Sequence, residues 1–73
     1  MEEHVMVHKA NSIASFFAAY SHEEAVAGVA NHLQLYWEPR MRRQLHEYIS
    51  TGGAGLDELV IEAARRLRPA TVR

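Results

Sequence analysis

The sequence predicts an all-α fold, namely a compact bundle of about four short helices. Apolar residues recur in steps of three and four along most of the 73 residues, which is the spacing of one face of a helix. No segment alternates apolar and polar residues for long enough to form a strand. Proline and clustered glycines interrupt the helical pattern, and the short links between helices favour antiparallel neighbours.

The first helix is expected over residues 4–20. Phe16 and Phe17 are about 100° apart around such a helix, so one of them lies at the edge of the buried face or outside it. From Val5 onward, the apolar face is predicted to include Met6, Ala10, Ile13, Ala14, Phe17 and Tyr20.

The second helix is predicted to begin after Ser21. The Ser21 hydroxyl can accept a hydrogen bond from the backbone N–H of Glu24, whose carboxylate can reach back, and this pair forms a capping box. Glycine inside a helix costs roughly 1 kcal/mol relative to alanine. Its presence at position 28 is explained either by the close approach of another helix or by simple tolerance. Pro39 ends the helix, and its corner can set two helices across each other. The buried stripe is predicted to hold Ala25, Val26, Val29, Ala30, Leu33, Tyr36 and Trp37.

The third helix is expected over residues 39–50, because proline suits the first position of a helix. Gly52 or Gly53 can then adopt the left-handed conformation that ends a helix. A fourth helix is expected over residues 56–67, with acidic residues at its start and arginines at its end, as the helix dipole favours. Pro69 stops this helix. The inward residues are predicted to be Met41, Leu45, Tyr48 and Ile49, followed by Leu56, Leu59, Val60, Ala63, Ala64 and Leu67.

Length and composition predict a single domain that has a partner. Residues 1–73 are expected to form one helical domain, with an ordered core over about 5–68 and a C-terminal tail at 69–73. Hydrophobic residues make up 48% of the chain, whereas a domain of this size buries only about 60% of its unfolded surface. We therefore expect a partner to cover part of the apolar surface. The sequence has no cysteine, which excludes disulfides, cysteine-ligated zinc and a thiolate nucleophile.

Charge is distributed unevenly along the chain. Residues 1–38 carry one lysine against five glutamates, and residues 39–73 carry seven arginines against four carboxylates. Arginine suits interfacial pairing with carboxylates, although a solvated surface would explain the same pattern. The sequence has neither an apolar run of about 18 residues nor a basic flank before an apolar stretch. We therefore expect a cytoplasmic protein with no membrane contact.

No catalytic, cofactor-binding or metal site is predicted. His4 and His8 face the same way on a helix, but the sequence places no third ligand beside them. The glycines at 52–55 follow a helix and no Lys-Ser/Thr pair comes after them, so they do not form a phosphate loop. A free-standing homo-oligomeric bundle is one alternative. A small nucleic-acid-binding regulator is another, but the net charge of −1 lacks the usual basic footprint, so no nucleic acid is expected at Arg40, Arg42, Arg43, Arg65, Arg66 and Arg68.

The helix corner at residues 36–42 is the most informative segment. It gathers Tyr, Trp, Arg and Met, which are enriched in interface cores, and adjacent side chains at a corner cannot all enter one small core. In the alternative interpretation, Trp37 and Met41 fill the bundle and the arginines are solvated. Arg40 and Arg42 begin a helix, where the dipole disfavours positive charge, so we expect carboxylate partners in this chain or another. The candidate partner-binding residues are Phe16, Tyr36, Trp37, Pro39, Arg40, Met41 and Arg42.

Three blocks of sequence carry a family resemblance. Residues 9–17 read KANSIASFF, residues 29–42 read VANHLQLYWEPRMR, and residues 52–60 read GGAGLDELV. They resemble the delta subunit of soluble, molybdenum-containing, NAD-dependent formate dehydrogenases, which has M-A-N-Q-I-x-x-F-F, I-A-x-H-hydrophobic-x-x-F-W-D-P-R-M-R and G-G-x-G-L-x-x-L-V. The central block is the most specific, because helical amphipathicity does not produce W-acid-P-R-M-R. Ser12 stands where the family has glutamine.

The resemblance implies a non-catalytic accessory subunit of a complex that oxidises formate to carbon dioxide and reduces NAD⁺. The alpha subunit of such enzymes carries a bis-pterin molybdenum centre and iron–sulfur clusters. The beta and gamma subunits carry FMN, further clusters and the NAD site. The delta chain is expected to hold none of these cofactors, to bind the alpha subunit, and to support assembly or stability of the holoenzyme.

Overall fold

The computed structural model describes residues 2–67, and within this range the chain forms four α-helices and no strand. The all-α prediction is therefore confirmed. The predicted stop at Pro69 and the tail that follows it lie outside the described residues. The helices are α1 (Glu3–Phe17), α2 (His22–Tyr36), α3 (Pro39–Ser50) and α4 (Glu58–Arg66).

Two helices are shorter than the sequence predicts. α1 ends at Phe17, and the next three residues form a turn in which the N–H of Tyr20 bonds to the carbonyl of Phe17 at 3.0 Å. α4 begins at Glu58 instead of residue 56, because Asp57 caps it. The Asp57 carboxylate accepts a hydrogen bond from the N–H of Leu59 at 2.8 Å, which satisfies one of the free donors at a helix start.

α2 and α3 begin where the sequence predicts. The Ser21 hydroxyl accepts a hydrogen bond from the N–H of Glu24 at 3.3 Å, and Pro39 is the first residue of α3. α3 ends at a pair of glycines, Gly52 and Gly53, with φ of 121° and 63°. Their N–H groups bond to carbonyls of the last turn of α3 at 3.0 and 3.1 Å. This is a Schellman ending, which requires the backbone freedom of glycine.

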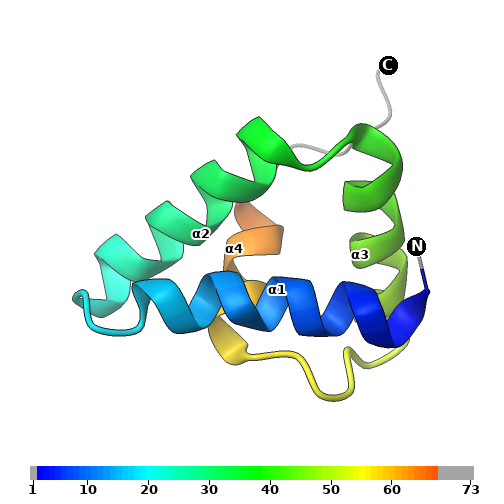
Figure 1. The fold of residues 1–73 in the computed structure, drawn as a ribbon, viewed down its shortest axis with the longest axis horizontal. Helices are drawn as coiled ribbons and strands as arrows, with labels where there is room; N and C mark the ends of the chain where they lie inside the picture. The colour runs from blue at the N-terminus through cyan, green and yellow to red at the C-terminus, as the bar shows by residue number, and fades with distance from the viewer. Residues whose placement is uncertain (1, 68–73) are drawn as a thin grey trace.

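The helices pack around one centre (Figure 1). α1 and α2 run in roughly opposite directions and diverge as a V from the turn that joins them. α4 packs against both, most extensively against α2. α3 stands at the far end from the α1–α2 turn, where it contacts α4 and is joined to α2 by a sharp corner. This arrangement leaves the corner at the rim of the molecule.

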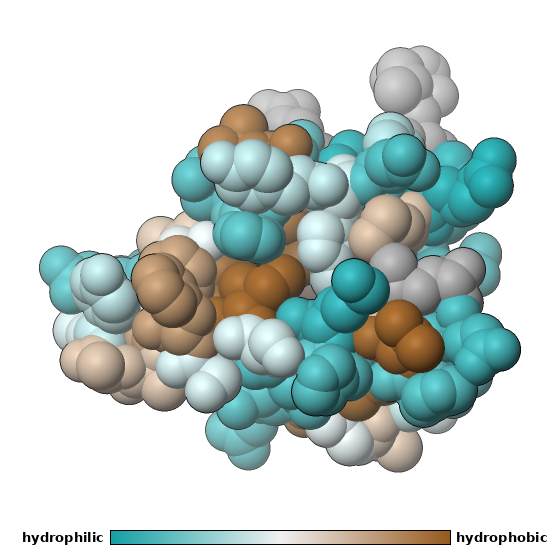
Figure 2. Space-filling view, viewed as in Figure 1, coloured by the Kyte–Doolittle hydropathy of each residue, from teal (hydrophilic) through white to brown (hydrophobic). Residues whose placement is uncertain are grey.

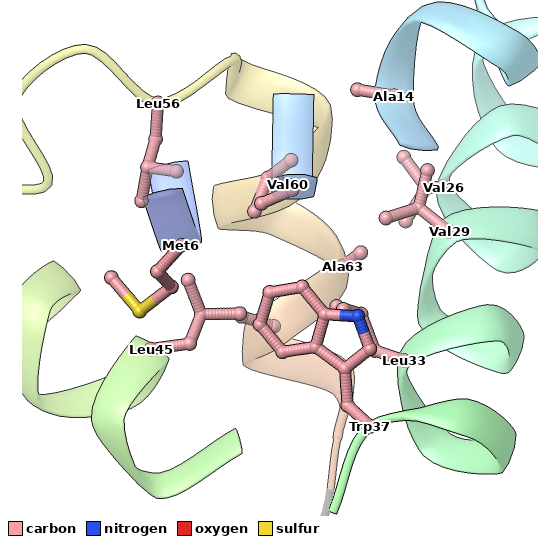
Figure 3. Packing of buried hydrophobic residues seen from close by; sticks show 12 residues of the cluster. Met6, Ala14, Val26, Val29, Leu33, Trp37, Leu45, Leu56, Val60 and Ala63 are labelled. Atoms are coloured by element: carbon pink, nitrogen blue, oxygen red, sulfur yellow. The ribbon is translucent and has the colours of Figure 1, made fainter. Parts of the chain in front are cut away.

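The core draws on all four helices (Figure 3). The indole ring of Trp37 lies among Leu33 of α2, Leu45 of α3 and Ala63 of α4. Each of these contacts joins a different helix to the corner, so one side chain ties three helices together. The core cluster consists of Met6, Ala10, Ala14, Val26, Val29, Leu33, Trp37, Leu45, Leu56, Val60, Ala63 and Ala64.

Gly28 marks the close approach of α1 and α2. A Cβ atom at position 28 would lie 2.5 Å from Cε1 of Phe17, well inside van der Waals contact. Of the two explanations that the sequence left open, close approach is the one that the structure supports. Phe17 is half-buried and packs against the core, whereas Phe16 is exposed, which confirms that the two rings divide between inside and outside.

Two aromatic residues predicted for buried faces are instead on the surface. Tyr20 is 53% exposed and Tyr36 is 70% exposed. Tyr20 lies beyond the end of α1, so the helical spacing that predicted its burial no longer applies. Tyr36 is the last residue of α2, and Trp37 leaves the helix to enter the core in its place.

Candidate functional site

The α2–α3 corner consists of two residues in extended geometry. Trp37 has φ −90° and ψ 134°, and Glu38 has φ −66° and ψ 154°. The N–H of Trp37 still bonds to the carbonyl of Leu33 at 3.1 Å, so the chain departs only after the last helical bond is made. Pro39 follows, and its ring favours extended geometry in the residue before it. The sharp change of direction is therefore a property of local sequence.

This departure from helical geometry separates two neighbouring aromatic side chains. Trp37 is only 6% exposed, whereas Tyr36 is 70% exposed and the preceding Leu35 is 63% exposed. The Tyr36 ring packs against His32, one turn earlier, with centroids 4.8 Å apart. Tyr36 is thus held against its own helix with most of its surface available, while Trp37 serves the core.

Arg42 braces the corner from inside. Its Nη1 donates hydrogen bonds to the carbonyl of Trp37 and to the carbonyl of Gln34, the latter at 3.3 Å. These carbonyls belong to the C-terminal end of α2, where a cation is favoured by the helix dipole. Within residues 2–67, the expectation that Arg42 pairs with a carboxylate is therefore wrong. The positive charge compensates the end of α2, although it lies near the start of α3.

Arg40 and Arg43 differ from Arg42. Both are exposed, and within the described residues neither forms an ion pair or a side-chain hydrogen bond. Arg40 lies in the first turn of α3, where the dipole disfavours a cation by about 0.3–1 kcal/mol. We call the exposed side chains of Leu35, Tyr36, Arg40 and Arg43 the corner surface. Of the other candidate residues, Pro39 is exposed and Met41 is half-buried against the core.

A second group of exposed aromatic residues surrounds the C-terminal end of α1. Phe16 is 71% exposed, and its ring meets Phe17 edge-on at 5.0 Å between centroids. Tyr20 packs against the other side of Phe17 at 5.6 Å. Figure 2 shows apolar surface over this end of α1 and at the end of α2, with hydrophilic residues around both. The candidate residue Phe16 is therefore not part of the corner surface.

His46 lies on α3, one turn after Arg42, and is half-buried. Burial lowers the pKa of this imidazole below its ordinary value of 6.5, and the nearby Arg42 guanidinium lowers the pKa further. The ring is therefore neutral at neutral pH. Protonation of His46 is therefore less favourable in the folded chain than in the unfolded chain.

A polar cluster on another side of the molecule joins α2 to α4. Glu62 Oε1 lies 2.8 Å from His22 Nε2, and Arg66 pairs with Glu23 at 2.9 Å and with Glu62 at 3.8 Å. The cluster neutralises one member of the C-terminal arginine group that suggested nucleic-acid binding. Because these side chains are 40% to 74% exposed, each pair contributes only about 0–1 kcal/mol.

The described residues show no arrangement suited to metal binding. No group of three His, Cys, Asp or Glu side chains within residues 2–67 lies close enough to hold a metal ion. In the same range, no helix has the length and hydropathy needed to span a bilayer.

The first and third sequence blocks meet in the structure through hydrogen bonds between a side chain and the backbone. Asn11, in the first block, donates Nδ2–H to the carbonyl of Gly55 at 2.8 Å and accepts from the N–H of Asp57 at 2.8 Å. One amide side chain therefore bonds to both a carbonyl and an N–H group of the segment between α3 and α4. The central block supplies Trp37, which is buried in the core, and Arg42, whose hydrogen bonds hold the corner. Much of the motif thus maintains the fold, and its outward residues are the ones available for function.

The sequence did not lead us to predict the positions or contacts of three residues, Leu35, Arg43 and Asn11. Leu35 lies off the stripe that contains Val29 and Leu33, which is a signal for exposure that could have been used. Arg43 follows Arg40 by three residues and so shares its side of α3, which is a second available signal. The role of Asn11 depends on contacts 44 and 46 residues away, and no local pattern indicates it.

Comparison with known proteins identifies the family. A family model described as NADH-dependent formate dehydrogenase delta subunit FdsD matches residues 6–64, a range that contains all three sequence blocks. Neither a curated protein nor a solved structure matches the chain. The match covers well over half of the 73 residues and includes the Asn11 contacts, the corner and the glycine-rich loop. The chain therefore belongs to the family of NADH-dependent formate dehydrogenase delta subunits.

Proposed function

We propose that this chain is a non-catalytic accessory subunit that binds the alpha subunit of a cytoplasmic NAD-dependent formate dehydrogenase and supports its assembly or stability. The observation that carries the proposal is the family match over residues 6–64. An accessory role accords with the sequence, which has no cysteine to ligate an iron–sulfur cluster or to act as a nucleophile.

The cofactors of the reaction belong to the other subunits in this proposal. The alpha subunit would hold the bis-pterin molybdenum centre and iron–sulfur clusters, and the beta and gamma subunits would hold FMN, further clusters and the NAD site. The contribution of this chain is contact surface. Four large hydrophobic side chains are more than half exposed in the described range, at Phe16, Tyr20, Leu35 and Tyr36, and such residues are typical of a chain that functions in a complex.

Co-expression tests the accessory role directly. The alpha subunit is produced with and without this chain, and the yield of soluble alpha subunit and of the co-purified complex is measured. We expect a stable complex and a higher yield when the chain is present. The purified chain alone should not reduce NAD⁺ with formate. Equal yields and separate elution of the two chains would contradict the proposal.

Thermal unfolding provides a second measurement. A partner present at 100 times its dissociation constant stabilises the folded chain by about 2.7 kcal/mol. The melting temperature of this chain should therefore rise when the alpha subunit is added in excess. An unchanged midpoint at saturating alpha subunit would show that the two proteins do not bind.

A further inference from the structure

We propose that the corner surface, formed by Leu35, Tyr36, Arg40 and Arg43, docks on an apolar pocket of the alpha subunit that is rimmed by carboxylates. This inference rests on the proposed function and specifies the contact by which it is carried out. It assigns binding to the outward residues of the corner and leaves Trp37, Met41 and Arg42 to the fold.

The apolar centre of the surface consists of two neighbouring exposed side chains. Leu35 and Tyr36 are adjacent, 63% and 70% exposed, and both lie in the last turn of α2. The Tyr36 ring lies against His32, with centroids 4.8 Å apart, so it has a packing contact on its own helix while most of its surface stays exposed. Large aromatic residues that bury extensive area at low entropic cost are the usual anchors of protein interfaces.

The charges beside this centre indicate the chemistry of the partner. Arg40 and Arg43 extend from the first turns of α3, directly after the corner, and no carboxylate within residues 2–67 pairs with either. Two guanidinium groups that have no carboxylate partner within residues 2–67, on the helix that follows the apolar centre, are complementary to carboxylates on a partner.

The aromatic residues at the end of α1 fit this role less well. Phe16 and Tyr20 both pack against Phe17, with centroids at 5.0 and 5.6 Å, so each ring already has an apolar neighbour. The two groups are separated along α2: Phe17 lies against Gly28 in the middle of α2, whereas Leu35 lies two turns further along, in its last turn. Variants can therefore test them separately.

The experiment measures binding of the full chain to purified alpha subunit by calorimetry, beside circular dichroism of each variant. Tyr36→Ala and Leu35→Ser test the apolar centre, and the double variant Arg40→Glu/Arg43→Glu tests the charges. Phe16→Ala is the control for loss of an exposed aromatic ring. Arg65→Glu is the control for charge reversal, because Arg65 is also exposed and unpaired within the described residues.

We expect Tyr36→Ala to raise the dissociation constant by about tenfold or more, as at an interface anchor. The double charge variant should slow association and reduce the dependence of affinity on salt. Both controls should bind within about twofold of the unchanged chain, since a change outside an interface leaves the affinity nearly intact.

Corner variants that fold and still bind like the unchanged chain would overturn the assignment, as would a larger loss for Phe16→Ala than for Tyr36→Ala. If the unchanged chain itself does not bind the alpha subunit, the proposed function fails and the assignment fails with it. Binding by the unchanged chain together with unaffected corner variants would overturn the assignment alone.

Discussion

The two junctions on either side of α3 are both held by a polar side chain that reaches backbone groups, but from different distances. At the α2–α3 corner, Arg42 contacts the carbonyls of Trp37 and Gln34, five and eight residues earlier. At the α3–α4 loop, Asn11 reaches Gly55 and Asp57 from α1, 44 and 46 residues away. The side-chain hydrogen bonds that hold the corner therefore need only α2 and α3, whereas those of the loop form only when α1 is docked.

The two junctions also differ in what their outer sides leave available. Polar groups of the loop are bonded within the chain. Tyr48 donates its hydroxyl hydrogen to the carbonyl of Ala54, and Asn11 bonds to the carbonyl of Gly55 and to the N–H of Asp57. The corner is held by residues on its inner side. Its outer side presents Tyr36 and Arg40, and within residues 2–67 the Arg40 side chain has no ion pair or hydrogen bond. Because inner residues stabilise the corner, its outer residues are free to bind a partner without being needed for the fold.

The largest expected effect separates the two aromatic residues of the corner. Trp37→Ala should destabilise the fold by about 3–5 kcal/mol, because it leaves a cavity where three helices meet. This is comparable to all that a core of this size supplies, about 3–5 kcal/mol, so the variant should be largely unfolded. Tyr36→Ala is the matched control and should change stability by about 0.5 kcal/mol or less. Urea unfolding followed by circular dichroism measures both, and equal losses would contradict the inside–outside division.

The next largest effect separates two arginines of the same helix. Arg42→Ala should cost about 1.5–3 kcal/mol, because it removes charge-assisted hydrogen bonds to the end of α2. Arg40→Ala should instead stabilise the fold by about 0.3–1 kcal/mol, since it removes a cation from the start of α3. The same unfolding measurement applies. If Arg42→Ala is as stable as Arg40→Ala, the Arg42 brace does not support the corner.

A smaller loss is expected at the loop. Asn11→Ala removes two neutral hydrogen bonds and should cost about 1–2 kcal/mol. Hydrogen exchange should quicken at residues 51–57 and remain slow at the corner, which Asn11 does not touch. Ser12→Ala is the control, because within residues 2–67 the Ser12 hydroxyl bonds only to the carbonyl of His8 in its own helix. Uniform acceleration across the molecule would show that the two junctions are not independent.

Local rules predicted most of the fold. The Ser21 cap, the helix start at Pro39 and the left-handed ending at Gly52 each depend on a few neighbouring residues, and the structure confirms them. The division of Phe16 and Phe17 follows in the same way from the 100° step of a helix. These features required no knowledge of how the helices pack.

The errors arose where a helix ends or where distant segments meet. Tyr36 was predicted to be buried because the helical spacing was continued through the last turn, but the chain leaves the helix there and turns Trp37 inward. Within residues 2–67 Arg42 bonds to carbonyls that the end of α2 exposes, which the sequence argument did not consider, and a carboxylate partner in another chain stays a prediction. The contact of Asn11 with the loop needs the packed fold, so the sequence alone could not indicate it.

The smallest expected effect is a pH dependence that belongs to the corner. Burial, and then the Arg42 charge, lower the pKa of His46 in the folded chain below its ordinary value of 6.5. At pH values between the lowered pKa of the folded chain and 6.5, the unfolded chain binds more protons than the folded chain. The free energy of unfolding therefore falls as the pH drops below 6.5. The stability that neutral His46 maintains is therefore present above that pH and is lost on acidification.

Two substitutions assign this pH dependence to its causes. His46→Gln keeps a polar side chain that cannot be protonated, so the fall in stability below pH 6.5 should be smaller than in the unchanged chain. Arg42→Ala removes the lesser cause and should reduce the slope only in part, because burial of the ring persists. Urea unfolding over a series of pH values measures the slopes. If the slope of His46→Gln equals that of the unchanged chain, other groups control the acid response, and the corner and the loop would not differ in their sensitivity to acid.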